Sequence, residues 1–250
     1  MAIAACVSDL ANLIFPRACP CGEWDTDLCP DCRSALTVGW RRVDTQAPYL
    51  ARVGADGELY YPYPTYALAE YLDPAARVIV SWKNQVNAGL EAEIAALWRS
   101  ELAKAPVSQW FGLAAVTGSE NNPVLWVPAP SAASRKRSGR FVAGVLAQQA
   151  GQTWGGKYAD VLARQSGWFA AIDSRGRPLQ LSGRGQKSHR IYPTADLTGK
   201  RVIAVDDVVT TGATIAGISR AVNQAGGQLI GAIALAAAPD PRKSSVGNVS

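Results

Sequence analysis

One segment of the sequence, Val202–Thr214, constrains the fold more than any other. Its residues read VIAVDDVVTTGAT. Four apolar residues, Val202–Val205, are typical of a short buried strand, and two adjacent carboxylates, Asp206 and Asp207, follow them. Small hydroxyl and glycine residues then lead into a helical pattern. In an open α/β sheet, ligands bind beyond the carboxyl ends of the strands, so this order of strand, acidic pair, loop and helix predicts a binding site.

The loop after the acidic pair has the size and chemistry of a phosphate site. A loop that opens a helix offers free N–H groups and the positive end of the helix dipole, and Gly212 lets the backbone approach an anion closely. The carboxylates of Asp206 and Asp207 would repel that phosphate, but they suit hydroxyl groups or a divalent cation on the same ligand. We therefore expect a sugar phosphate, with its phosphate held by Thr210, Thr211, Gly212, Ala213 and Thr214.

Two other interpretations of this segment are open at the level of sequence. It can be an ordinary strand end at the surface, with Thr210 or Thr211 capping the next helix. A nucleotide P-loop fits less well, because the Gly-Lys-Ser/Thr ending of that motif is missing. The segment closely resembles the signature of type I phosphoribosyltransferases. That resemblance implies that Asp206 and Asp207 contact the ribose hydroxyls of 5-phosphoribosyl-1-pyrophosphate (PRPP), while the loop holds its 5′-phosphate.

Four of the five cysteines lie close together near the N-terminus. They form one Cys-x-Cys pair and one Cys-x-x-Cys pair, and in a reducing compartment such pairs indicate a metal site before a disulfide. We expect a structural zinc held by four thiolates, although the first pair is one residue shorter than usual. A vestigial site, a redox pair or a ligand from Cys6 is the alternative. The expected ligands are Cys19, Cys21, Cys29 and Cys32.

Composition and charge are those of an ordinary globular protein of 250 residues, with 48% hydrophobic and 18% charged residues. No apolar run reaches the length of a membrane span, and residues 1–15 lack the basic start of a signal peptide. We expect a cytoplasmic protein without membrane insertion. The net charge of +5 comes partly from clusters at 135–140 and 175–190, which suit a solvated face, pyrophosphate or nucleic acid.

Strand and helix patterns alternate along the chain, which predicts an α/β fold with a parallel sheet covered by helices on both faces. We divide the chain into an N-terminal helix and cysteine module (1–40), a phosphoribosyltransferase-like domain (41–238) and a flexible tail (239–250). The polar stretch 164–193 is expected to be a mobile lid. Strands are expected near 49–53, 66–68, 124–127, 161–162, 201–205 and 229–236. Helices are expected near 73–84, 90–105 and 138–150, and from the end of the segment 202–214 to about 225.

The arrangement as a whole resembles the ComF family of competence-associated phosphoribosyltransferase-like proteins. The matching pieces are residues 9–16 with the cysteines, Arg77–Lys83, Val127–Pro130, Gln180–Ser182 with Arg184, and the segment 202–214. The chain departs from that family at Ser138–Val142, where an Asn-Gln pair is missing. Relative to the pattern of that family, segments 107–122 and 166–176 resemble insertions.

The leading hypothesis is Mg²⁺-assisted transfer of phosphoribosyl from PRPP to an unknown base or amine, with release of pyrophosphate. Asp206 and Asp207 would fix the ribose and stabilise the positive charge that develops on it. Arg184 is the first candidate for contact with pyrophosphate, and further candidates are Lys83, Arg135, Lys136 and Lys187. Lys83 fits a surface helix end equally well, and His189 is expected to be a solvated loop residue.

The second hypothesis is a binding protein that keeps the PRPP pocket without transferase activity. It would act in metabolic sensing or in DNA uptake, with single-stranded DNA or competence proteins as partners. The basic clusters and the cysteine module would then be contact surfaces. Salt-sensitive DNA binding would favour this hypothesis. No motif identifies the acceptor or the oligomeric state.

Overall fold

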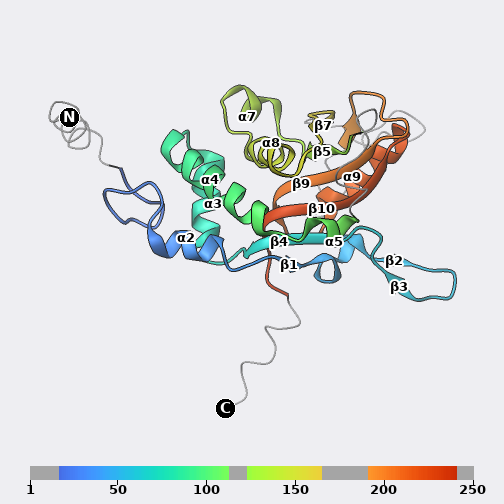
Figure 1. The fold of residues 1–250 in the computed structure, drawn as a ribbon, viewed down its shortest axis with the longest axis horizontal. Helices are drawn as coiled ribbons and strands as arrows, with labels where there is room; N and C mark the ends of the chain where they lie inside the picture. The colour runs from blue at the N-terminus through green and yellow to red at the C-terminus, as the bar shows by residue number, and fades with distance from the viewer. Residues whose placement is uncertain (1–16, 113–122, 165–190, 241–250) are drawn as a thin grey trace, which may run out of the picture.

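The computed structural model of the chain describes residues 17–112, 123–164 and 191–240 (Figure 1). Its larger sheet has the strand order β1–β4–β10–β9–β5–β6. All of these strands run parallel except β1, which pairs antiparallel with β4 at one edge. The strands are β1 (Arg41–Arg42), β4 (Thr65–Glu70), β5 (Leu125–Pro128), β6 (Lys157–Tyr158), β9 (Arg201–Val209) and β10 (Gln228–Ala237).

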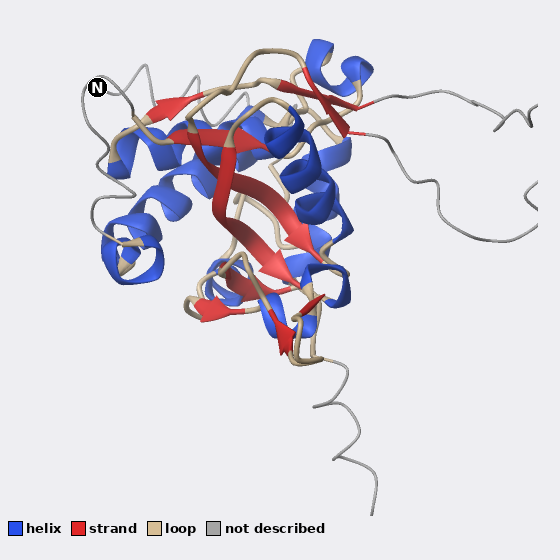
Figure 2. Cartoon of the chain, turned by 90° about the vertical axis from the view of Figure 1, so that its right-hand side faces the viewer, coloured by secondary structure: helices blue, strands red, loops and turns tan. Residues whose placement is uncertain are grey.

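Helices lie on both sides of this twisted sheet (Figure 2). They are α2 (Pro30–Leu36), α3 (Ala75–Asn84), α4 (Ala88–Lys104), α5 (Val107–Phe111), α7 (Ala133–Arg137), α8 (Val142–Trp154) and α9 (Ala213–Gln224), with the 3₁₀ turns η1 (Asp44–Gln46) and η2 (Pro48–Leu50). Two small antiparallel pairs complete the described structure: β2 (Arg52–Val53) with β3 (Leu59–Tyr60), and β7 (Leu162–Arg164) with β8 (Ile191–Pro193).

The sheet separates two apolar clusters, because neighbouring residues of a strand point to opposite faces. Along β9, Ile203 and Val205 join the cluster that contains buried residues of α3, α4 and α8. Val202 and Ala204 join the other cluster, together with the buried face of α9. A mostly parallel sheet covered by helices was predicted from the sequence, and the structure confirms it.

The connections that leave β5 and β9 run in opposite directions. From β5 the chain passes through α8 to β6 at one edge, whereas from β9 it passes through α9 to β10 on the other side. The helices α8 and α9 consequently cover opposite faces of the sheet. Adjacent parallel strands whose connections diverge leave a crevice beyond their carboxyl ends, which is where α/β proteins bind ligands.

Strand β9 is longer than the sequence predicted. The sequence predicts a strand that ends at Val205, before the acidic pair, but the strand continues to Val209. The reason is its pairing with β10, in which Asp206 lies opposite Ala234 and Val208 lies opposite Ala236. The backbone of the acidic pair is therefore held in the sheet, and only Thr210–Gly212 forms the loop before α9.

Two other predicted boundaries were wrong. The expected strand at 49–53 is mostly the 3₁₀ turn η2, which begins at Pro48, and extended structure is confined to β2. The helix expected from Ser138 begins instead at Val142, because Gly139 has a φ of 70° and separates it from the short helix α7. The other predicted strands and helices agree with β4, β5, β7, β10, α3, α4 and α9 to within a few residues.

The cysteine-bearing segment packs on the same cluster as α3 and α4. Cys19, Cys29 and Cys32 are buried there together with side chains of both helices. Arg77 of α3 donates a hydrogen bond to the main-chain oxygen of Cys21 at 3.4 Å. The carboxylate of Asp27 lies against the start of α4 at Gly89. Helices α3 and α4 thus rest directly on the cysteine segment.

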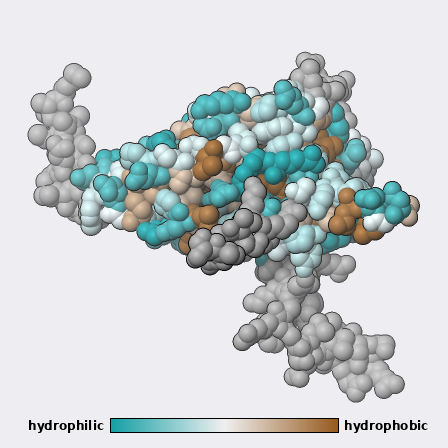
Figure 3. Space-filling view, turned by 90° about the horizontal axis from the view of Figure 1, so that it is seen from below, coloured by the Kyte–Doolittle hydropathy of each residue, from teal (hydrophilic) through white to brown (hydrophobic). Residues whose placement is uncertain are grey.

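The hairpin β2–β3 projects from the end of the molecule opposite the cysteine segment (Figure 1). Val53 and Leu59 on it are 68% and 62% exposed, and hydrophobic residues gather at that end of the surface (Figure 3). Among the helices of the described ranges, none is long and apolar enough to cross a membrane. The lid expected at 164–193 and the tail expected at 239–250 fall almost entirely outside the described residues.

Candidate active site

A pocket of about 320 Å³ opens beyond the carboxyl ends of β5 and β9, where their connections diverge. Its wall includes the turn after β5, the acidic end of β9, the last turn of α3 and the start of α8. The lining residues are Tyr71, Lys83, Ala129, Pro130, Ser131, Arg135, Arg140, Phe141, Val142, Ala143, Arg164, Asp206, Asp207, Val208, Thr210 and Thr214.

The acidic pair forms the floor of this pocket, and both residues are buried. The main-chain N–H of Asp207 donates a hydrogen bond to Oδ1 of Asp206 at 2.8 Å, which orients that carboxylate. Burial, reinforced by the adjacent charge of Asp207, raises the pKa of Asp206 well above its usual value. Burial of two adjacent carboxylates is unfavourable in free energy, so this site should bind a cation or hydroxyl donors that offset it.

Lys83, in the last turn of α3, contacts the acidic pair across the pocket. Its Nζ lies 2.7 Å from Oδ2 of Asp207. The sequence left open whether Lys83 belongs to a site or to an ordinary helix surface, and the structure places it in the pocket wall. The neighbouring residue is fixed as well, since Arg140 donates a hydrogen bond to the main-chain oxygen of Asn84 at 3.1 Å.

A second, smaller hollow of about 70 Å³ adjoins the pocket at the loop Thr210–Gly212 and the first turn of α9. Gly212 has a φ of 77° and stands immediately before the helix. Thr210, Thr211, Ala213 and Thr214 are exposed around the hollow. Free N–H groups and the positive end of the dipole of α9 meet there, and no acidic residue lies in the first turn of that helix. The hollow therefore suits a phosphate group.

Three arginines line the large pocket but not the smaller hollow, namely Arg135, Arg140 and Arg164. Burial, together with the nearby charge of Arg135, lowers the pKa of Arg164, while Asp206 acts in the opposite direction. Sequence reasoning proposed Arg135 but missed Arg140 and Arg164 as site residues. Arg140 belongs to the basic cluster that was singled out, whereas Arg164 ends a short strand that carries no motif.

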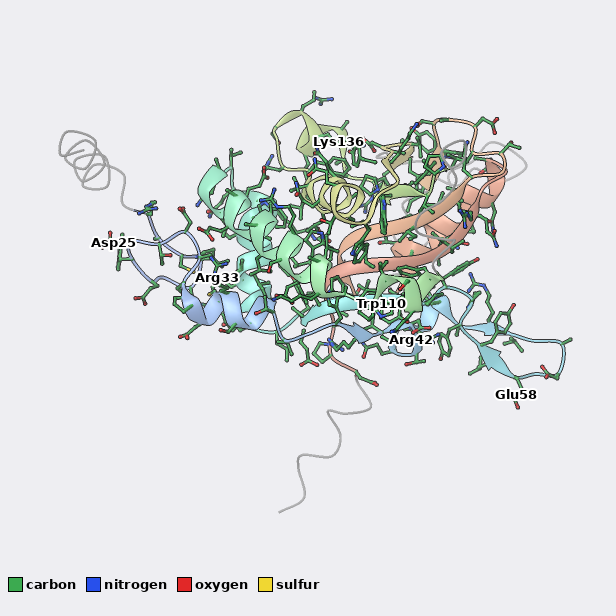
Figure 4. All side chains as sticks on the ribbon, in the orientation of Figure 1. Asp25, Arg33, Arg42, Glu58, Trp110 and Lys136 are labelled. Carbon is green, nitrogen blue, oxygen red and sulfur yellow. The ribbon has the colours of Figure 1, made fainter. Side chains whose placement is uncertain are left out.

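Of the other cationic candidates, Lys136 is the one that lies within the described residues, and it does not line the pocket. Lys136 lies on α7 (Figure 4), pairs with Asp160 at 2.7 Å and stands over the ring of Phe141 at 4.5 Å. Its ammonium group therefore already has an anionic and an aromatic partner. Arg184, Lys187 and His189 lie outside the described residues.

The four clustered cysteines converge on one point. Their Sγ atoms all lie within 4.8 Å of one another, and the main-chain N–H of Cys29 donates to Sγ of Cys19 at 3.4 Å. A hydrogen bond with the backbone of Glu23 is the main cause that lowers the pKa of Cys21 to about 7, whereas burial raises the pKa of Cys19 and of Cys32. Four thiol sulfurs at this separation fit the tetrahedral donor set that Zn²⁺ prefers.

The short first pair reaches this geometry through a tight turn. Gly22 has a φ of 106°, and its N–H donates to the main-chain oxygen of Cys19 at 2.8 Å. The turn brings Cys19 and Cys21 to the same side although only one residue separates them. The predicted gathering of the four thiols is confirmed, and the spacing that seemed a departure is accommodated by glycine.

Comparison with known proteins bears on the same region. No curated protein sequence matches the chain. The model of the phosphoribosyl transferase domain family matches residues 135–249. These residues include α8, the acidic strand β9, the loop Thr210–Gly212 and helix α9. The match to that family thus covers the part of the chain that supplies most of the residues lining the pocket beyond β9.

Proposed function

We propose that the protein binds PRPP together with Mg²⁺ and transfers its phosphoribosyl group to an unidentified base or amine, releasing pyrophosphate. One observation carries this proposal. The buried acidic pair and the open N-terminus of α9 flank a single pocket at the divergence of β5 and β9. A ligand that satisfies both features must carry an anionic phosphate and, a short distance away, hydroxyl groups or a cation.

The proposed orientation follows from charge. The 5′-phosphate would occupy the hollow at Thr210, Thr211, Gly212, Ala213 and Thr214, where N–H groups and hydroxyls can donate to it. The ribose hydroxyls would donate to Asp206 and Asp207. The pyrophosphate would then extend toward the cationic wall, which contains Lys83, Arg135, Arg140 and Arg164. Arg184 and Lys187 remain candidates for the same role from outside the described residues.

The chemistry asks the protein mainly for positioning and charge stabilisation. Departure of pyrophosphate leaves positive charge on the ribose ring, and the two carboxylates at the pocket floor would stabilise it. The arginines would stabilise the negative charge of the leaving group. When bound, Mg²⁺ supplies further neutralisation of the pyrophosphate and ribose oxygens. The carboxylate of Asp206 is oriented by the N–H of Asp207, and the backbone of both residues belongs to β9, so little reorganisation of the acidic pair would be needed at the moment of reaction.

We further propose that the four cysteines hold a structural Zn²⁺. The observation in its favour is the convergence of four sulfurs within 4.8 Å. The four are free thiols in the structure, so each sulfur is available as a ligand. Because α3 and α4 rest on this segment, the metal would stabilise the part of the fold that presents Lys83 to the pocket.

A second candidate function is a PRPP-binding protein without transferase activity that contacts single-stranded DNA or competence proteins. Helix α7 favours it, because Arg135 and Arg137 on this short basic helix are exposed beside the pocket. Phosphate contacts by such residues release counterions, so DNA binding would weaken steeply with salt. Fluorescence anisotropy with labelled single-stranded DNA, measured at low and physiological salt with and without PRPP, tests this candidate.

Release of pyrophosphate from PRPP is the direct test of transfer. We expect release that depends on Mg²⁺ and on one acceptor class within a panel of nucleobases and amines. Asp206→Asn should abolish it, whereas Glu58→Gln should not, since Glu58 is an exposed carboxylate on the remote hairpin β2–β3 (Figure 4). PRPP binding without release for any acceptor would favour the second candidate.

A further inference from the structure

We propose that Lys83 is a displaceable internal cation, which occupies the acidic pair in the ligand-free protein and gives it up to PRPP with its metal. The inference starts from the ion pair between Nζ of Lys83 and Oδ2 of Asp207 at 2.7 Å. Their side chains are 29% and 13% exposed, so this pair is better shielded than a surface salt bridge and retains more of its Coulomb attraction. The proposal rests on the proposed function, which it deepens.

The position of this pair indicates a role in binding rather than in stability. Helix α3 is anchored to the core by Ala75, Val78, Ile79 and Trp82, which lie on its buried face. Lys83 does not belong to that face, and its side chain reaches across the pocket to β9. An ion pair that spans a ligand pocket must be broken or rearranged when the ligand enters. It is therefore suited to act as a placeholder.

The acidic pair needs such a placeholder. Asp206 and Asp207 are adjacent, buried and lie on the same pocket floor, so their charges repel one another at short range. In the ligand-free protein the ammonium of Lys83 offsets part of that charge. A free divalent cation would have to compete with this ammonium for the oxygens of Asp207, and we infer that it is excluded as long as Lys83 is in place.

The complex of PRPP with a divalent cation resolves this competition, because it brings a positive charge for the carboxylates and anionic oxygens for the lysine. Its hydroxyl groups and associated cation would satisfy Asp206 and Asp207, while its pyrophosphate offers new anionic oxygens to the displaced ammonium. Lysine suits the exchange, since its charge lies at the end of a flexible four-carbon stem. The exchange can take place by rotation of this side chain alone, while α3 stays anchored to the core through its buried face. The divalent cation would consequently enter with PRPP and not before it.

Binding of Mn²⁺ to the ligand-free protein, measured by electron paramagnetic resonance, tests the inference without any assay of activity. Wild type should bind Mn²⁺ only weakly. Lys83→Met keeps much of the side-chain length but removes the charge, and it should tighten Mn²⁺ binding by roughly tenfold or more. Lys83→Arg should behave like wild type. The double variant Lys83→Met, Asp207→Asn should lose the gain, which would assign the new cation site to the acidic pair.

Lys104→Met is the matched control, because Lys104 forms an exposed ion pair with Glu101 at 2.7 Å on α4, away from the pocket. It should leave Mn²⁺ binding unchanged. Equal Mn²⁺ affinity in wild type and Lys83→Met would overturn the inference. So would tight binding of Mn²⁺ to ligand-free wild type that Asp207→Asn removes, and this second measurement does not depend on whether Lys83→Met folds.

Calorimetry with PRPP and Mg²⁺ separates this inference from the proposed function. Lys83→Met should weaken PRPP binding, because the pyrophosphate loses one cationic partner. If wild type binds no PRPP while Lys83→Met gains Mn²⁺, the proposed function fails and the internal cation stands. If wild type binds PRPP while Lys83→Met gains no Mn²⁺, the internal cation fails and the proposed function stands.

Discussion

Gly212 lies against Leu50, so closely that a Cβ atom at position 212 would be 2.7 Å from Cγ of Leu50. The same position has a φ of 77°, which residues other than glycine adopt only with strain. Leu50 is fully buried in the turn η2 and cannot easily withdraw. Two independent constraints thus require glycine immediately before α9. One is the positive φ, and the other is the lack of space for a Cβ atom next to Leu50.

Gly212→Ala should destabilise the fold by about 1–3 kcal/mol and weaken PRPP binding, because the loop must shift to admit the methyl group. Thermal denaturation and calorimetry measure the two effects. Gly57→Ala is the matched control, since Gly57 has a φ of 83° but no atom within 4 Å of a Cβ. It should lose stability through the backbone angle alone and bind PRPP normally. Equal behaviour of the two variants would contradict the crowding at Leu50.

Asp206→Asn and Asp207→Asn should each weaken PRPP binding by roughly tenfold or more, since a charge-assisted hydrogen bond is worth about 1.5–3 kcal/mol. Their effects on stability should differ. Asn at 206 removes a buried charge next to another, and should raise the melting temperature. Asn at 207 leaves the ammonium of Lys83 without its partner and should lower it. A shift of both melting temperatures in the same direction would refute this assignment of charges.

Stability should also depend on pH through Asp206. Its raised pKa means that the folded state holds a proton at pH values where the unfolded state has released it. Stability is then greatest below the unfolded pKa of about 3.9 and falls as pH rises toward the folded value. Asp206→Asn removes this contribution, so its advantage over wild type in urea denaturation should grow with pH across that window, and Glu58→Gln should show no such trend.

Thr211→Val tests the hydroxyls of the phosphate loop with little change of shape. Thr211 is exposed, and its main-chain oxygen accepts a hydrogen bond from the N–H of Tyr49 at 2.9 Å, which valine preserves. The free energy of unfolding, measured by thermal denaturation, should therefore stay within about 0.5 kcal/mol of the wild-type value. PRPP affinity should fall severalfold, by about 1 kcal/mol, through loss of one hydrogen bond. Unchanged affinity would place the phosphate elsewhere.

The residues that sequence could place are those that lie together along the chain. The acidic pair, the loop before α9 and the four cysteines are each local, and their chemistry follows from residue type and spacing. Strand β9 was expected to end too early, because its last residues are polar or follow carboxylates while the ladder with β10 decides its length. Propensity is a weak guide where tertiary pairing of this kind acts.

The remainder of the site depends on contacts between distant segments. Arg164 and Tyr71 reach the pocket because β7 and β4 end near it, and nothing in their neighbourhoods marks them. Lys136 was proposed for pyrophosphate from its place in a basic cluster, but it contacts Asp160 and Phe141 and does not line the pocket. Lys83 could be singled out by resemblance, whereas its partner Asp207 could be found only in the structure.

Removal of the metal tests the cysteine centre. We expect about one zinc per chain in protein prepared under reducing, zinc-replete conditions. Structural zinc can contribute on the order of 10 kcal/mol to a small module, so a strong chelator should lower the melting temperature markedly. PRPP affinity should fall as well, because α3 rests on this segment and carries Lys83. Elemental analysis that finds no zinc, or a melting temperature insensitive to chelation, would argue against the centre.

Isothermal titration of PRPP into the wild-type protein in the presence of Mg²⁺ measures directly whether the pocket binds this ligand. We expect saturable binding of about one PRPP per chain, lost or strongly weakened in Asp206→Asn and Asp207→Asn and retained in Glu58→Gln. Absence of binding at millimolar PRPP with Mg²⁺, in protein that melts cooperatively, would contradict it, and the basic surface at α7 would then become the first candidate for the function of the chain.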